Sequence, residues 1–255
     1  MYNQIIMRLS IIIIIIGLSI SANAQTYNKR EHTKNLPKFE KRFMHFGFLL
    51  GYNIANFRVD RKIPDFTTDS LLVLEPQTAP GFNLGIISDL HLGDYFSLRF
   101  TPNLAFSSRS LVYTFETING IETYQKDIES TLINFPLNIK YKSVRLNNFS
   151  AYIIGGAAYT LDLASNADAD NFSTKLSDII VKLKRDDVVG QIGVGTDFYL
   201  QYFKFGIELK MSYGFFNLLE DDNTALSTPI QRLLSKMFLL SFSFEGLINC
   251  FSAKY

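Results

Sequence analysis

The residues of this sequence best suited to chemistry are two histidines and an aspartate. His45, Asp89 and His91 sit in segments where apolar and polar residues alternate, and each falls on the polar face of an extended chain. A hydrolytic site would need a nucleophile, a base and an orienting carboxylate within mutual reach. No serine in a strained turn motif accompanies the three residues, and two histidines with one aspartate are a weak metal set. We therefore expect no catalytic, cofactor-binding or metal-ligating residues.

More charged side chains fall on the same polar faces. Together with the first three they form the set His45, Asp89, His91, Arg99, Lys140, Asp197, Lys204, Glu208, Lys210 and Glu245. A packed soluble core rarely accepts so many charges. Unpaired charges in a narrow interior would be costly, so we expect these groups to pair with one another.

Two glycine-rich stretches invite comparison with phosphate-binding loops. Gly155-Gly156 and Gly193-Val194-Gly195 have neither the spacing nor the strand-then-helix context that such a loop requires. Glycines on a curved strand more often relieve curvature or make room for a bulky neighbour. We expect that structural role here.

Strict alternation marks the elements that must position the charges. In residues 203–213 one face carries Phe203, Phe205, Ile207, Leu209, Met211 and Tyr213, and the other carries Lys204, Gly206, Glu208, Lys210 and Ser212. Similar segments occupy residues 44–54, 82–92, 96–107, 133–141, 149–161, 188–200 and 238–245, although the facing of 149–161 is ambiguous. A tilted strand of about ten residues crosses a bilayer. The pattern therefore predicts an all-β fold, a transmembrane antiparallel β-barrel of about eight strands with lipid outside and a polar interior.

Connection lengths support the same fold. Short links at 93–94, 143–148 and 201–202 alternate with long polar segments near 59–79, 109–127, 162–187 and 214–236. This alternation is typical of an up-and-down meander with short periplasmic turns and long extracellular loops, and it places both termini in the periplasm. In loop 162–187, apolar residues at 172, 176, 179, 180 and 183 have the spacing of a short helix that would cap the barrel or bind a partner.

The N-terminal segment reads as an export signal. Arg8 precedes the apolar run 9–20, and Ala22-Asn23-Ala24 forms a signal-peptidase site, although retention as an anchor is the alternative. We predict a cleaved signal peptide at 1–24, a periplasmic N-terminal tail at 25–43 and an outer-membrane β-barrel at 44–255. The tail is mostly basic, and Asn35-Leu36-Pro37 interrupts regular structure, so we expect an extended segment.

Charge and cysteine content exclude several function classes. Removing Arg8 with the leader leaves a formally neutral chain, which argues against a nucleic-acid surface. Cys250 is the single cysteine of the sequence, so neither an intrachain disulfide nor a cysteine metal cluster can form. No cofactor is expected.

Several stretches resemble the PorT family, small outer-membrane barrels of the Bacteroidetes associated with type IX protein secretion and gliding motility. The matching stretches are 35–48 at the junction of tail and barrel, 135–142, 152–159 and 193–205. The resemblance implies a non-enzymatic component or assembly factor of the secretion apparatus. Its partners would be outer-membrane lipid and other secretion-system proteins, contacted through the loops and the periplasmic tail. A stand-alone barrel, either a narrow solute channel or a lipid-modifying enzyme, is the alternative.

Overall fold

The computed structural model describes residues 34–37, 39–40, 42–62, 71–117, 120–165, 179–220, 222, 224 and 226–246. These residues form one antiparallel sheet of nine strands. The strands are β1 (Met44–Arg61), β2 (Leu71–His91), β3 (Phe96–Phe100), β4 (Asn103–Thr117), β5 (Gly120–Lys142), β6 (Phe149–Asp162), β7 (Asp186–Tyr199), β8 (Phe203–Gly214) and β9 (Ile230–Gly246). In the part of the chain that is described, no helix has the length and apolar character needed to span a membrane.

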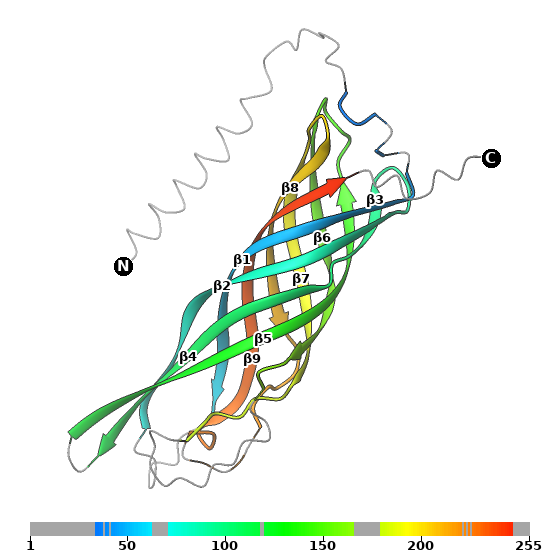
Figure 1. Ribbon diagram of the computed structural model, residues 1–255. Coiled ribbons are helices and arrows are strands. Elements are labelled where there is room, and N and C mark those ends of the chain that lie inside the picture. Colours follow the sequence, from blue (N-terminus) through cyan, green and yellow to red (C-terminus); the bar gives the residue numbers. More distant parts are fainter. Residues whose placement is uncertain are drawn as a thin grey trace, which may run out of the picture. The chain divides into compact units, whose positions relative to one another are not determined.

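The sheet closes into a barrel because β1 pairs with both β2 and β9 (Figure 1). Strands β3 and β4 together take one place in the wall, since both lie between β2 and β5. The break between them falls at Thr101-Pro102, where proline has no N–H to offer the ladder. The wall therefore has eight strand positions, and the predicted antiparallel meander is confirmed.

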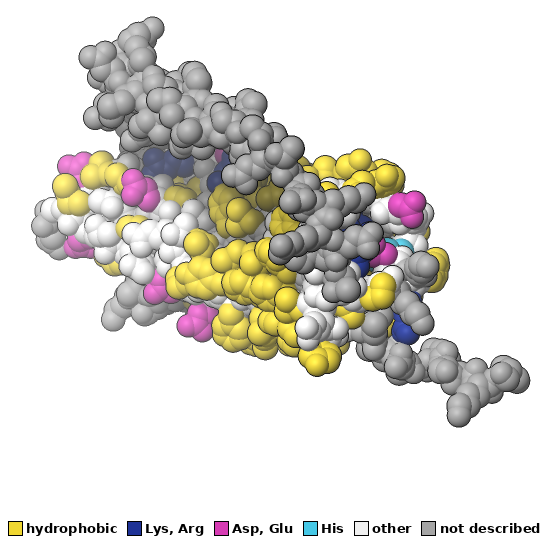
Figure 2. Space-filling model, turned by 90° about the horizontal axis from the view of Figure 1, so that it is seen from above, with side chains coloured by type: hydrophobic (Ala, Val, Ile, Leu, Met, Phe, Trp, Pro, Cys, Tyr) yellow, Lys and Arg dark blue, Asp and Glu magenta, His cyan; other side chains and the backbone are white. Residues whose placement is uncertain are grey.

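Side chains alternate between an apolar outer wall and a polar interior. On β7, Ile192 is 68% exposed whereas Asp197 is fully buried. On β6, whose facing the sequence left ambiguous, Tyr152 and Ile154 point inward and Ile153 points outward. Figure 2 shows the outward apolar side chains as a yellow zone over the middle of the barrel. This inverted arrangement suits a wall surrounded by lipid.

The short turns lie close to their predicted positions, at 92–95, 143–148 and 200–202. The prediction of a long loop over 109–127 is wrong, because β4 continues to Thr117 and β5 already begins at Gly120. Leu111 and Tyr113 are buried on the inward face of β4. The outward side chains of this part of β4 are mostly polar, and they lie beyond the lipid-facing zone. That outward polarity made a strand resemble a loop. The loops near 59–79 and 214–236 are likewise shortened by strand extensions, and residues 63–70 lie outside the described residues.

An apolar cluster fills the interior at the long-loop end. It comprises Phe57, Leu74, Leu111, Tyr113, Phe115, Ile179, Val181, Leu183, Leu218, Leu219, Leu226, Ile230 and Leu233. The predicted helix is wrong over residues 179–183, which are extended and form a β-bridge from Leu183 to Leu219. There Val181 is buried and Ile180 is exposed, which is the alternation of a strand. The predicted helix positions 172 and 176 lie outside the described residues.

Candidate functional site

A layer of buried charges crosses the interior near the short-turn end of the barrel. It contains four basic and four acidic side chains, namely Arg99, Lys140, Lys204, Lys210, Asp89, Asp197, Glu208 and Glu245. Each was predicted to face the interior, and each is nearly inaccessible to solvent. The formal charges of the layer balance. The predicted mutual pairing is therefore confirmed for these eight of the ten residues.

Arg99 is the centre of this layer. Its Nη2 donates to Asp89 Oδ2 at 2.7 Å and to Glu245 Oε1 at 2.8 Å, and its Nε donates to Asp89 Oδ2 at 3.1 Å. The bond to Glu245 joins β3 to β9 across the interior. The fork of the guanidinium allows one side chain to hold carboxylates from different strands at once.

Three lysines complete the ion pairs. Lys140 Nζ lies 2.6 Å from Asp197 Oδ2, and Lys204 Nζ lies 2.6 Å from Glu245 Oε2. Lys210 Nζ lies 2.9 Å from a carboxylate oxygen of Glu208. Because these partners come from β5, β7, β8 and β9, the layer ties distant parts of the wall together.

Tyr152 lies within the charged layer and contacts both Glu208 and Lys140. Its hydroxyl donates to Glu208 at 3.0 Å, and Lys140 Nζ sits 3.6 Å from the centre of its ring. Gly195 faces this ring so closely that a Cβ at that position would collide with it. The expectation that glycines here make room for a bulky neighbour is confirmed at this position.

A ladder of amides forms the next layer of the interior. Asn53 donates to Asn83, Asn83 to Asn103, and Asn134 also donates to Asn103, at distances of 2.5 to 3.3 Å. The cavity beside this ladder measures about 30 Å³. Since one water molecule needs about 10–15 Å³ of such space, the cavity has room for a few water molecules at most. An interior filled in this way is what eight strands normally enclose.

The described residues that precede β1 fold into the short-turn mouth of the barrel. Leu36 and Phe39 are buried with Tyr199, and the Phe39 ring stacks on His45 with centroids 3.9 Å apart. The Asn35 side chain donates to the carbonyl of Tyr199 at 2.9 Å. This corrects the expectation of an extended segment for residues 34–37, 39, 40 and 42, because burial of two apolar side chains anchors them. Residues 25–33 lie outside the described residues.

The two histidines are brought together at this mouth. The ring centroids of His45 and His91 are 4.7 Å apart in an edge-to-face arrangement. We call the described residues from Lys34 to Arg42 the mouth segment. His45 Nε2 donates to the carbonyl of Phe39 at 2.7 Å, so this histidine holds the mouth segment in place. Within the described residues, no cluster of three or more His, Cys, Asp or Glu side chains is arranged to hold a metal ion. Sequence reasoning found both histidines but missed Phe39, because no periodicity marks an isolated turn.

Comparison with known families decides the class of this barrel. The family model described as "Outer membrane protein beta-barrel domain" matches residues 23–220. The chain belongs to this family. It is therefore an outer membrane protein, as its alternating strands predicted. A search of curated proteins gave no match.

Three solved structures were found to be similar to this chain. OprG of Pseudomonas aeruginosa is 14% identical, with 78% of this chain and 95% of that chain covered and a TM-score of 0.40. Ail, the attachment invasion locus protein of Yersinia pestis, is 14% identical, with coverages of 80% and 99% and a TM-score of 0.37. Neisserial surface protein A is 11% identical, with coverages of 78% and 96% and a TM-score of 0.39.

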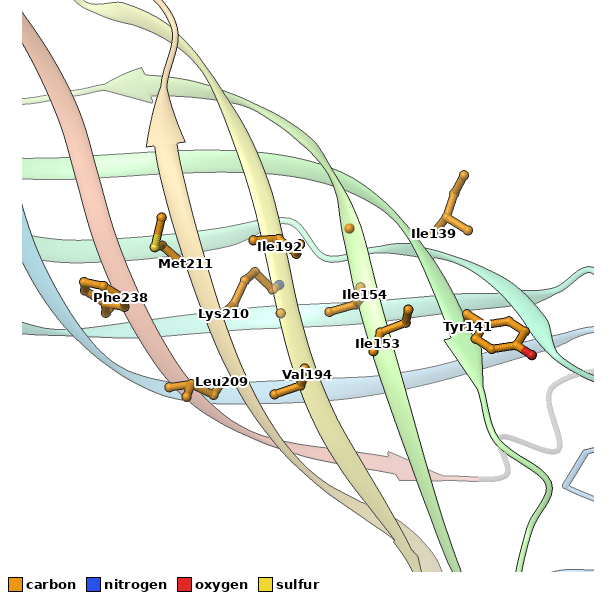
Figure 3. A pocket seen from close by; sticks show the side chains of 12 residues that line it. Ile139, Tyr141, Ile153, Ile154, Ile192, Val194, Leu209, Lys210, Met211 and Phe238 are labelled. Atoms are coloured by element: carbon orange, nitrogen blue, oxygen red, sulfur yellow. The ribbon is translucent and has the colours of Figure 1, made fainter. Parts of the chain in front are cut away.

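The outer wall of this outer membrane barrel bears a shallow recess of about 540 Å³. Figure 3 shows its lining side chains, among them Ile139, Ile153 and Ile192, which come from neighbouring strands. Gly155 contributes no side chain, and a Cβ there would meet only one atom at ordinary contact distance. The recess opens onto the lipid-facing wall, so acyl chains can fill it. Lys210 of the charged layer is also one of the residues that line the recess.

The mouth segment should loosen in acid. Partial burial alone would raise the pKa of the Glu40 carboxyl. The hydrogen bond of 3.0 Å from Lys142 and the positive charge of Lys142 act in the opposite direction, with smaller contributions from Tyr199 and Arg145. The pKa of Glu40 is therefore lowered. A lowered folded-state pKa stabilises the docked segment above the ordinary value of about 4.3, and this stabilisation is lost as pH falls through the lowered value. We expect amide exchange at Phe39 and Arg42, measured by NMR in micelles and corrected for intrinsic rates, to accelerate only below about pH 4.3. In Glu40→Gln the step should vanish; a step that persists would assign it to another group.

Proposed function

We propose that this outer membrane barrel is a non-enzymatic component or assembly factor of type IX protein secretion and gliding motility. The observation that carries the proposal is the filled interior. The charged layer, the amide ladder and the apolar cluster succeed one another along the barrel, and the cavity beside the ladder has room for a few water molecules at most. A barrel filled in this way offers no passage for a folded or unfolded protein. Its contribution to secretion is therefore made by surfaces outside the interior.

The resemblance to the PorT family supports the secretion role. The stretch 35–48, which carries part of the resemblance, includes the mouth segment and the start of β1. In the structure this stretch supplies Phe39 and His45, whose stacked rings anchor the chain at the short-turn mouth of the barrel. A partner in the periplasm would meet the barrel at this end. We assign docking of other secretion-system proteins to the periplasmic tail and the loops.

The tail can be tested separately from the barrel. Replacing residues 26–33 by a glycine-serine linker of equal length leaves the anchored segment 34–42 untouched. We expect a folded, heat-modifiable barrel in the outer membrane together with impaired export of cargo, measured as protein in the culture medium. A variant in which residues 26–33 are shuffled controls for charge, because it keeps composition and length. Full export by the linker variant would reject docking through this segment.

Two further measurements test the proposed function as a whole. Deletion of the gene should abolish export, and mild detergent extraction should recover the barrel with other secretion-system proteins. A barrel that is recovered alone, and that conducts ions in planar bilayers, would instead be a stand-alone channel. Normal export after deletion would reject the secretion role directly.

A further inference from the structure

The long-loop end of the barrel carries a sheet edge that no described strand covers. Strand β5 pairs with β4 from Asn134 back to Gly120, whose partner is Thr117. Its pairing with β6 on the other side begins only at Leu132. Among the described residues, no strand pairs with this side of β5 from Ile121 to Glu129. At about 3.3 Å per residue, this edge is about 30 Å long. Figure 1 shows the β4–β5 hairpin projecting from the barrel.

The backbone groups along this edge point away from β4. The carbonyl of Thr131 accepts a hydrogen bond from the N–H of Leu163, on the β6 side of the strand. Successive residues of a strand direct their N–H and C=O groups to opposite sides. The groups that face the edge are therefore those of Ile121, Thr123, Gln125, Asp127 and Glu129. Such a row is a template for another extended chain.

The edge of β5 lacks the protection found on the opposite edge of the same three-stranded extension. On that opposite edge, β2 is uncovered by β1 from Leu71 to Thr78, which includes Pro76, and proline blocks strand addition because it lacks an N–H. Residues 121–129 of β5 contain no proline. An exposed, regular edge of this length normally carries such a block unless it has a partner.

The outward face of the extension is acidic. Its described residues on β2, β4 and β5 include the exposed side chains Glu75, Glu116, Asp127 and Glu129. The basic residues of these segments, Arg109 and Lys126, lie on the inward face. Arg109 is opposite Ile128 in the strand register and Lys126 is opposite Leu111, and Ile128 and Leu111 both face inward. On that inward face, Tyr124 and Ile128 border the apolar cluster and alternate with Glu122 and Lys126. A strand added here would need basic side chains outward and apolar side chains inward.

We propose that the edge of β5 from Ile121 to Glu129 binds an extended polypeptide segment with alternating basic and apolar residues, by adding it to the sheet as a further strand. Main-chain hydrogen bonds to the edge supply affinity that is independent of sequence. The acidic outer face favours basic side chains on one face of the added strand, and the border of the apolar cluster favours apolar side chains on the other. The proposal does not depend on the role in secretion, since it concerns the extracellular end alone.

The probe is a capped nine-residue peptide of alternating lysine and valine, added to detergent-solubilised, folded barrel and followed by fluorescence anisotropy. We expect saturable binding and little binding of the glutamate–valine analogue. Gln125→Pro removes an edge-facing N–H without removing a bond to β4, and it should weaken binding by at least about tenfold. Gln125→Ala keeps the N–H and should bind as the unaltered protein does. Asp127→Lys with Glu129→Lys should reverse the preference between the two peptides.

A second measurement leaves the protein unaltered. Peptides N-methylated at every lysine or at every valine block opposite sides of the added strand, so only one of the two should still bind. Equal binding of both peptides, or equal binding to Gln125→Pro and Gln125→Ala, would overturn strand addition in favour of nonspecific charge attraction. If Gln125→Pro abolishes self-association of the barrel and no peptide binds, a second copy of the chain is the partner and the proposal is wrong.

Discussion

Arg99→Met should lower the free energy of unfolding by about 3–5 kcal/mol. The change removes the cation that lies 2.7 Å from Asp89 and 2.8 Å from Glu245, both buried. Methionine fills much of the same space, so the loss comes chiefly from buried carboxylates left without their main partner. Urea unfolding in lipid vesicles, followed by heat modifiability on gels, measures the effect.

Two variants test the cause of that loss. Arg99→Met combined with Asp89→Asn removes one negative charge along with the positive one, and it should be less destabilising than Arg99→Met alone. Arg58→Ala breaks a pair with Asp60 in which the Arg58 side chain is 58% exposed, so it should cost less than about 1 kcal/mol. If the double variant is as unstable as the sum of its two single variants, Arg99 acts through packing and not through charge.

Leu209→Lys should destabilise the barrel by about 2–4 kcal/mol, because it places a charge on the lipid side near the bilayer midplane. Leu209 is 53% exposed on the outer wall and lies near the middle of β8. Refolding into vesicles of defined lipid gives the free energy. Leu209→Met, a volume-conserving control, should cost less than about 1.5 kcal/mol.

The neighbouring position offers the opposite comparison. Lys210 is buried in the interior and pairs with Glu208 at 2.9 Å. Lysine is thus native at 210 and should be excluded at 209, although the two positions are adjacent in sequence. Equal tolerance of lysine on the outer wall would mean that the inside and outside faces of β8 have been exchanged, or that this wall is not in lipid.

The sequence by itself determined the wall of this protein. Alternation with a period of two is a local property, so each segment predicted its own lipid-facing and interior residues. The short turn at 143–148 was likewise visible, because the polar link separates two alternating runs and coincides with the gap between β5 and β6. The outer-membrane location followed from strand length and from the inverted polarity.

Only the tertiary structure decided which groups meet. Arg99 and Glu245 are 146 residues apart in sequence, and their contact depends on closure of the sheet and on the register of every strand between them. The same holds for Phe39, which reaches His45 through a turn that carries no periodic signal. The continuation of β4 and β5 beyond the lipid was also hidden. There a strand with a polar outer face has the composition of a loop, and only its partner strands and the apolar cluster beneath it define it as sheet.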